Sequence, residues 1–271
     1  MWNVYFTLNE ASPVEADAEF DGVTVSVKLR NRELSVVGIQ VADKNRAITE
    51  AENLANRFLD TLCWKHHADL AIDLTALRIE EIGPGEQRHI YLQIKETLTV
   101  SDRVSIVARD SIGNVVAVFD SAKRGRIEVK CSEAAAYYRR SRLSSDPFDQ
   151  FRNFYLVAEN VADRIRTKKG IHHKLHEQEL LELALRECFG SNLTRLHRAA
   201  SSVAGCQDQG DVIHGVATLL YKGHRCQLNH AKASQNKKVP FNPEDERQVR
   251  AVLPLMRFVA RSLLVYEERN L

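Results

Sequence analysis

Residues 219–230 read LLYKGHRCQLNH, and this stretch decides how we interpret the C-terminal half of the chain. An apolar helical pattern leads up to Tyr221, and Gly223 is expected to break that helix. Arg225 and His230 follow, with four residues between them. In a straight helix, a separation of five positions places two side chains roughly 140° apart, on different faces. We therefore predict that Arg225 lies in a turn, or that the group that works with it comes from a second copy of the chain.

An arginine and a histidine together have the chemistry needed to cleave RNA without a metal ion. Histidine titrates near neutral pH, so His230 is suited to move a proton to or from a ribose oxygen. The guanidinium of Arg225 stays protonated and matches two phosphate oxygens, so it is suited to stabilise the extra negative charge on phosphorus. In an alternative interpretation, Arg225 forms a structural ion pair and His230 caps a helix.

The sequence around this pair predicts helices from Asp146 to the C-terminus. Asp146 is a suitable N-cap, Pro147 follows at the first helical position, and apolar residues then recur at helical spacing. A polar, basic loop is expected at 231–241 before the last helix, which Pro254 should kink. The further helices are expected near residues 180–189, 193–200, 211–221 and 242–264.

Within this helical context, residues 225–230 resemble the R-x4-H motif of HEPN domains. These are all-helical modules that commonly dimerise and often act as metal-independent ribonucleases, with two copies meeting to build one site. The resemblance covers residues 146–271 and implies a homodimer in which Arg225 and His230 are catalytic, assisted by His224 or Asn229. The position after the arginine is usually polar in this family and is Cys226 here.

Charge is distributed unevenly between the two halves of the chain. Counted as Lys and Arg against Asp and Glu, residues 146–271 carry an excess of four positive charges, and residues 1–145 an excess of two negative charges. The helical half is therefore the better partner for RNA. The side chains expected to contact RNA phosphates are Lys222, Lys232, Lys237 and Lys238.

Residues 1–142 are predicted to form an α+β domain, rich in strands and with one long helix. Val23 to Leu29 alternates with period two after the hairpin signal Asp21-Gly22, and a helix with one apolar face covers 45–63. This half has no phosphate loop or nucleophile elbow. We expect a recognition or regulatory role, with a purely structural role as the alternative. The border between the two halves is expected near residues 132–147, and its basic segment 134–142 would be a solvated linker, or else contact RNA.

Neither a metal nor a cofactor is expected. The histidines at 66–67 and 172–176 lack a second cysteine or histidine pair at a zinc-like spacing. The five cysteines are scattered and odd in number, which indicates a reducing compartment. The chain lacks a signal-peptide pattern and any stretch near the roughly 20 apolar residues of a membrane span. We therefore expect a cytoplasmic protein that does not bind membranes.

Three functions are compatible with these features. The first is a metal-independent endoribonuclease that acts at a composite homodimer site. The HEPN resemblance makes a toxin–antitoxin or antiviral defence system plausible for it, with an antitoxin or a defence-complex protein as a further partner. The second is a non-catalytic HEPN-like module that binds RNA, a nucleotide or a protein. The third is a metal-dependent enzyme built on the histidines.

Overall fold

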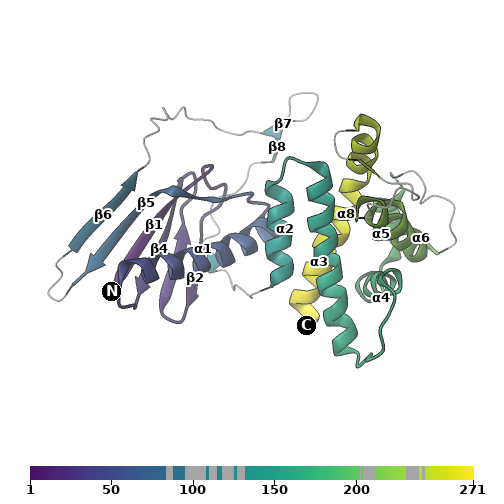
Figure 1. Ribbon diagram of the computed structural model, residues 1–271, viewed down its shortest axis with the longest axis horizontal. Helices are drawn as coiled ribbons and strands as arrows, with labels where there is room; N and C mark the ends of the chain where they lie inside the picture. Colours follow the sequence, from purple (N-terminus) through teal and green to yellow (C-terminus); the bar gives the residue numbers. More distant parts are fainter. Residues whose placement is uncertain are drawn as a thin grey trace. The chain divides into compact units, whose positions relative to one another are not determined.

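The structure is a computed structural model of the 271-residue chain (Figure 1). It describes residues 1–83, 88–94, 108–109, 115–117, 125–126, 132–201, 203, 211–229, 238–239 and 242–271.

The chain divides into two compact units. Unit 1 comprises Met1–Leu59 and Leu70–Val129, and unit 2 comprises Asp60–Asp69 and Lys130–Leu271. Helix α1 (Lys44–His66) begins in unit 1 and ends in unit 2. The division therefore falls earlier than the boundary at residues 142–146 that the sequence suggested, and it gives unit 2 a short contribution from the N-terminal half.

Unit 1 contains a seven-stranded sheet with the order β6-β5-β1-β4-β3-β2-β9. Neighbouring strands are antiparallel except for the parallel pair β2 and β9. Figure 1 shows α1 lying across this sheet, so the prediction of an α+β unit with one long helix is confirmed. The strands are β1 (Trp2–Leu8), β2 (Ala16–Phe20), β3 (Val23–Val27), β4 (Glu33–Ile39), β5 (Ile72–Ile82), β6 (Arg88–Ile94) and β9 (Gly125–Arg126), with a separate pair β7 (Ala108–Arg109) and β8 (Val115–Ala117).

Local sequence signals explain the main features of unit 1. Asp21 and Gly22 join β2 to β3 with φ angles of 47° and 86°, the positive values that a two-residue hairpin turn requires. Along α1, Ala51, Leu54 and Phe58 are at most 4% exposed and recur at helical spacing. The expected apolar face of this helix is therefore its buried face.

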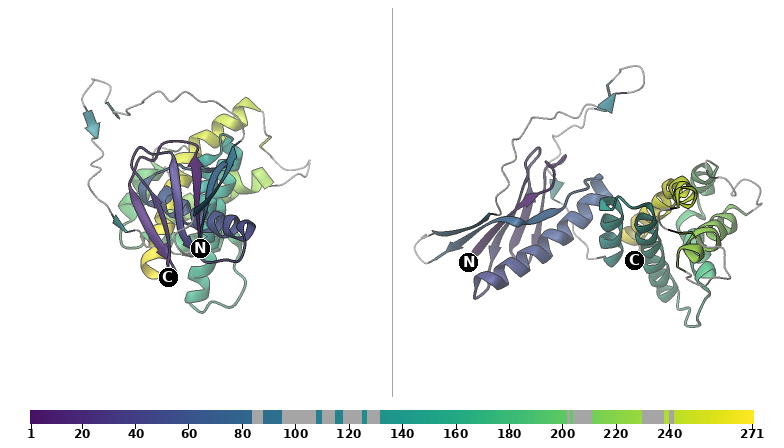
Figure 2. Two further views of the ribbon diagram at one scale, coloured as in Figure 1. Left: turned by 90° about the vertical axis from the view of Figure 1, so that its left-hand side faces the viewer. Right: turned by 45° about the horizontal axis from the view of Figure 1, so that its top comes forward.

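Unit 2 is helical, as predicted. The long helix α3 packs against α2 and α8, and also against α4 (Figures 1 and 2). The other helices complete the bundle. The elements are α2 (Glu133–Leu143), α3 (Pro147–Lys168), α4 (Glu177–Phe189), α5 (Leu193–Ala200), α6 (Val212–Thr218), the π-helix η2 (Leu219–Arg225), α7 (Cys226–Asn229) and α8 (Pro243–Asn270).

Capping side chains fix where the two longest helices of unit 2 begin. Asp146 Oδ1 accepts a hydrogen bond from the backbone N–H of Phe148 at 2.9 Å, and Asn242 Oδ1 accepts one from Glu244 at 3.0 Å. A proline follows each cap, where its missing N–H leaves no intrahelical bond unmade. Helix α8 continues through Pro254 to Asn270.

The segment predicted to be a solvated linker forms helix α2 instead. Arg139 Nε lies 2.9 Å from Asp60 Oδ1, and Arg142 Nε donates to Asp69 Oδ1 at the same distance. The Tyr138 side chain is fully buried. The linker prediction is therefore wrong, because tertiary contacts pair these cations with acids from the end of α1 and the residues after it. None of the helices in the described ranges is long and apolar enough to cross a membrane.

Candidate functional site

The helix that leads to the Arg225 motif does not end at Gly223. Residues 219–225 form the π-helix η2, which runs directly into α7. Gly223 allows a close approach, because a Cβ atom at this position would lie 3.3 Å from Leu219 Cδ1. The predicted break is wrong, since the burial of Leu220 and His224 outweighs the low helix propensity of glycine. Arg225 therefore lies within a continuous helical stretch and not in a turn.

Arg225 is held between two carboxylates of its own chain. Its Nε atom lies 3.1 Å from Glu177 Oε2 at the start of α4, and its Nη2 atom lies 3.6 Å from Glu159 Oε1 on α3. The guanidinium also lies over the Tyr155 ring, 5.8 Å from its centroid. The Glu177 oxygen makes no hydrogen bond in the described residues despite its short distance, so this contact is an ion pair without hydrogen-bond alignment.

The carboxylates leave part of the arginine accessible. The Arg225 side chain is 22% exposed, Glu159 31% and Glu177 41%. Burial raises the pKa of Glu159, and the positive charge of Arg225 opposes this shift. The local balance is one cation against two acids, so an incoming phosphate must compete with Glu159 and Glu177 for the guanidinium.

Tyr221 and Cys226, on either side of Arg225 in the sequence, also interact with each other. Burial and a hydrogen bond with Cys226 raise the pKa of Tyr221 to about 12. The Tyr221 ring meets the His176 ring edge-on, with 5.2 Å between centroids. Cys226, which directly follows Arg225, therefore takes part in a polar contact.

His224 and Lys238 form a buried pair. Lys238 Nζ donates to His224 Nδ1 at 2.8 Å and to the carbonyl of Gly223 at 3.2 Å. His224 is 6% exposed and Lys238 is 8% exposed, and the His224 ring lies 5.5 Å from that of Phe151. Burial, and then the charge of Lys238, lower the pKa of His224 to about 3. Burial lowers the pKa of Lys238 to about 8, against an opposing effect of Asp245.

The geometry of this pair bears on two of the sequence predictions. Because His224 is neutral near pH 7 and its Nδ1 atom is occupied, it is not placed to donate a proton. The ammonium of Lys238 points inward to His224 and Gly223 and is not presented to solvent. Both residues therefore stabilise the helical stretch around Arg225.

The other predicted site residues are placed only in part. Lys222 is exposed on η2, as a phosphate contact would require. Asn229 is the last residue of α7. His230, Lys232 and Lys237 lie outside the described residues, so the structure does not place the predicted acid and base. No group of three His, Cys, Asp or Glu side chains in the described part of the chain is arranged to hold a metal ion.

Sequence reasoning missed the residues that surround Arg225. Tyr155 and Glu159 are four residues apart on α3, and Glu177 belongs to a different helix. A charged residue that is mostly buried needs a partner, so an acid near Arg225 was foreseeable. Which of the acids in this half would fill that role depends on how α3, α4 and η2 pack.

The burial of His224 against Lys238 predicts that the stability of unit 2 depends on pH. The unfolded histidine takes up a proton near pH 6.5, whereas the folded one does so only near pH 3. Between these values the unfolded state binds more protons, so stability falls as the pH decreases through this window. We expect His224→Gln, which keeps an acceptor for Lys238, to lose less stability than the parent between about pH 7 and pH 4.

Urea unfolding followed by fluorescence measures this difference in unit 2. Trp64 belongs to unit 2 and Trp2 to unit 1, so a Trp2→Phe background leaves Trp64 as the reporter. The acid-sensitive groups His66 and His67 are common to both proteins and cancel in the comparison. Equal losses of stability in parent and variant would show that His224 is not held neutral.

Comparison with known families places the site within a recognised sequence region. Residues 134–265 match the model of the family described as methylamine utilization protein MauJ. The MauJ match begins in α2 and ends in α8, so it includes η2, Arg225 and both of its carboxylate partners. It starts before Asp146, which agrees with the packing of α2 into unit 2. Neither a curated protein nor a solved structure gave a significant match.

Proposed function

We propose that unit 2 is a HEPN-like endoribonuclease domain that cleaves RNA as a homodimer without a metal ion. Arg225 stabilises the negative charge that develops on phosphorus. His230 moves the proton, either from the attacking 2′-hydroxyl or to the departing 5′-oxygen. The products are a 2′,3′-cyclic phosphate on one fragment and a free 5′-hydroxyl on the other.

The observation that carries this proposal is the position of Arg225 at the junction of η2 and α7. Helix α7 continues to Asn229, immediately before His230. If the helical stretch continued through residue 230, side chains five positions apart would diverge by roughly 140°, and one chain would not aim both groups at one phosphate. A second copy related by a twofold axis supplies the histidine, which is how the composite site of our proposal is built.

The carboxylates around Arg225 are compatible with this role. Glu159 and Glu177 come from two different helices and restrict the guanidinium to one region, which lowers the entropy lost when a phosphate binds. The exposed Lys222, three residues earlier, supplies a contact to a neighbouring phosphate. Free thiols at Cys63, Cys188 and Cys226 suit a reducing cytoplasm, and a toxin–antitoxin or antiviral role, with a matching protein partner, is part of the proposal.

The test is cleavage of RNA by the purified full chain in excess EDTA. We expect cleavage to persist under these conditions and to leave 2′,3′-cyclic phosphate ends, which mass spectrometry detects. An RNA with 2′-O-methyl riboses should resist, because its nucleophile is blocked. Cleavage that EDTA abolishes would instead support a metal-dependent reaction, and an absence of cleavage would support the second candidate.

The second candidate is a non-catalytic HEPN-like module that binds RNA, a nucleotide or a protein. It is favoured by the charge balance at Arg225, because two carboxylates already neutralise the guanidinium. In that case Arg225 is a structural residue, and RNA binds without being cut. A filter-binding assay run beside the cleavage assay separates the two candidates, and the nuclease proposal fails if bound RNA stays intact.

A further inference from the structure

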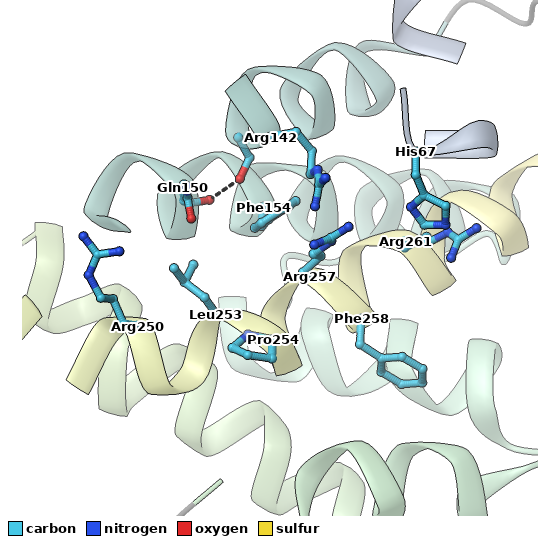
Figure 3. Close-up of a pocket in the computed structure, with 11 residues that line it drawn as sticks. His67, Arg142, Gln150, Phe154, Arg250, Leu253, Pro254, Arg257, Phe258 and Arg261 are labelled. Carbon is cyan, nitrogen blue, oxygen red and sulfur yellow. Dashed lines mark hydrogen bonds between the residues drawn. The ribbon is translucent and has the colours of Figure 1, made fainter. Parts of the chain in front are cut away.

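Unit 2 contains a basic pocket that Arg225 does not line, between α2, α3, α8 and the residue that follows α1. Its volume is about 580 Å³, which lies within the usual range for small-molecule sites. Four arginines and one histidine line it, together with an apolar part around Phe154 (Figure 3). The basic residues are His67, Arg142, Arg250, Arg257 and Arg261.

Two of these arginines have no acidic partner in the described part of the chain. Arg142 is paired with Asp69, and Arg250 with Glu246 at 2.6 Å. For Arg257 and Arg261, the structure gives no ion pair with any described residue, although both side chains are partly buried. The Nε atom of Arg261 is buried and has no hydrogen-bond acceptor within the described ranges. A buried donor without an acceptor is costly, and a bound anion would satisfy it.

The surroundings of His67 independently indicate a positive field in the pocket. Burial lowers the pKa of this imidazole, and the charges of Arg261, Arg257 and Arg142 lower it further, while Asp69 opposes them. Figure 3 shows the guanidinium groups of these three arginines gathered at the His67 end of the pocket. Two of them, Arg257 and Arg261, form no ion pair with a carboxylate of the described residues, so this end matches a ligand with two negative charges.

Apolar side chains also line the pocket. Phe154 on α3 and Leu253, Pro254 and Phe258 on α8 line it, with Leu253 and Pro254 between Arg250 and the basic end in Figure 3. An inorganic ion would leave this surface uncovered. A ligand that combines a dianion with an apolar group would contact both the arginines and this surface.

We propose that this pocket binds a small organic phosphate, with its phosphate monoester against Arg257 and Arg261 and its apolar group against Phe154 and Leu253. A phosphate monoester carries close to two negative charges near neutral pH, which equals the charge of the two arginines that have no acidic partner among the residues described. The proposal does not depend on the nuclease function, because the pocket shares no residue with the Arg225 site. An RNA strand is the less suitable occupant, since the site is a pocket of nucleotide size and not an extended groove.

Isothermal titration calorimetry on the full chain tests this proposal with four probes. The probes are the nucleoside 5′-monophosphates, each titrated separately at the same concentration, inorganic phosphate, an uncharged nucleoside and a short RNA. We expect at least one monophosphate to bind about tenfold or more tightly than inorganic phosphate, and the nucleoside not to bind. NMR should show the imidazole pKa of His67 rising when the monophosphate binds, because the dianion reverses the local field.

Variants connect the binding to the pocket. Arg257→Gln and Arg261→Gln should each weaken monophosphate binding about tenfold or more, whereas Arg257→Lys should lose less. Arg247→Gln is the matched control, because Arg247 also lies on α8, but is exposed and paired with Glu244 outside the pocket. Circular dichroism checks that each variant is folded.

Four results would overturn the proposal. The first two are that no monophosphate binds the parent, or that all monophosphates bind with the same affinity as inorganic phosphate. The third is that Arg247→Gln weakens binding as much as Arg261→Gln. The fourth is that RNA binds through Arg257 and Arg261 and is not displaced by the monophosphates. RNA cleavage in EDTA tests the nuclease proposal, and loss of monophosphate binding in the pocket variants tests the pocket proposal. Failure of either result leaves the other proposal standing.

Discussion

Replacing Arg225 by alanine is expected to slow RNA cleavage by about 100-fold or more, the usual cost of removing a group that stabilises charge in the transition state. His230→Ala should have an effect of similar size through the lost proton transfer. Cleavage of a fluorescent RNA in EDTA, measured with enzyme in excess, gives the rate of the chemical step. Arg225→Lys keeps the charge but loses the planar fork, so we expect it to recover only a small part of the activity.

Mixing the two inactive variants tests whether the site is shared between copies. If each site combines Arg225 of one copy with His230 of the other, a heterodimer of the two variants contains one intact pair. Random exchange of subunits then restores about a quarter of the parent activity, since half of the dimers are heterodimers and each has one of its two pairs. If both groups came from the same copy, mixing would restore nothing.

The structural interpretation of Arg225 makes a different prediction for the same variants. If the guanidinium serves to neutralise Glu159 and Glu177, Arg225→Ala destabilises unit 2 and leaves RNA binding and cleavage per folded molecule unchanged. Arg247→Ala is the control for loss of a positive charge, because its side chain is 75% exposed on α8. Parent-like cleavage by folded Arg225→Ala and His230→Ala would exclude both residues from the reaction.

Replacing Phe151 by alanine is expected to destabilise unit 2 by about 3–5 kcal/mol, the range for removing a large buried aromatic side chain. Phe151 is fully buried in the bundle core, and its ring lies 6.2 Å from that of Tyr155 and 5.5 Å from that of His224. The substitution removes the surface that supports both the π-helix and the aromatic ring beneath Arg225. Urea unfolding with Trp64 as the reporter, in the Trp2→Phe background, measures the change.

Leu156→Ala is the matched control for this prediction. Leu156 lies on the same helix and is 36% exposed, so we expect a change in the free energy of unfolding below about 1 kcal/mol. A Phe151→Ala variant that is as stable as Leu156→Ala would show that the core around η2 is packed more loosely than the structure indicates. We also expect the Phe151 variant to weaken the pH dependence assigned to His224, because water would reach the imidazole.

Local rules predicted most of the fold because the relevant interactions lie close together in the sequence. The caps at Asp146 and Asn242 and the turn at Asp21-Gly22 each depend on a few adjacent residues. The linker prediction failed at Arg139 and Arg142, because their acidic partners, Asp60 and Asp69, lie more than 70 residues away along the chain.

The candidate site was predicted less completely than the fold. The spacing to His230 singled out Arg225 as a candidate, but glycine propensity wrongly suggested a break where η2 continues. Lysines near the motif were expected at the surface, and Lys238 is instead buried against His224. Whether a lysine near the motif points outward depends on packing between distant helices, which composition and spacing do not specify.

The residues that α1 contributes to unit 2 affect how such a protein can evolve. Cys63 and Trp64 belong to the same hydrophobic core as the helices that follow residue 132, while Asp60 and Asp69 neutralise Arg139 and Arg142. A gene that recombined at residue 130 would inherit a bundle with an unfilled core and two unmatched cations. Descendants are therefore expected to keep the two halves together or to replace this contribution, because the helices after residue 130 do not form a complete core by themselves.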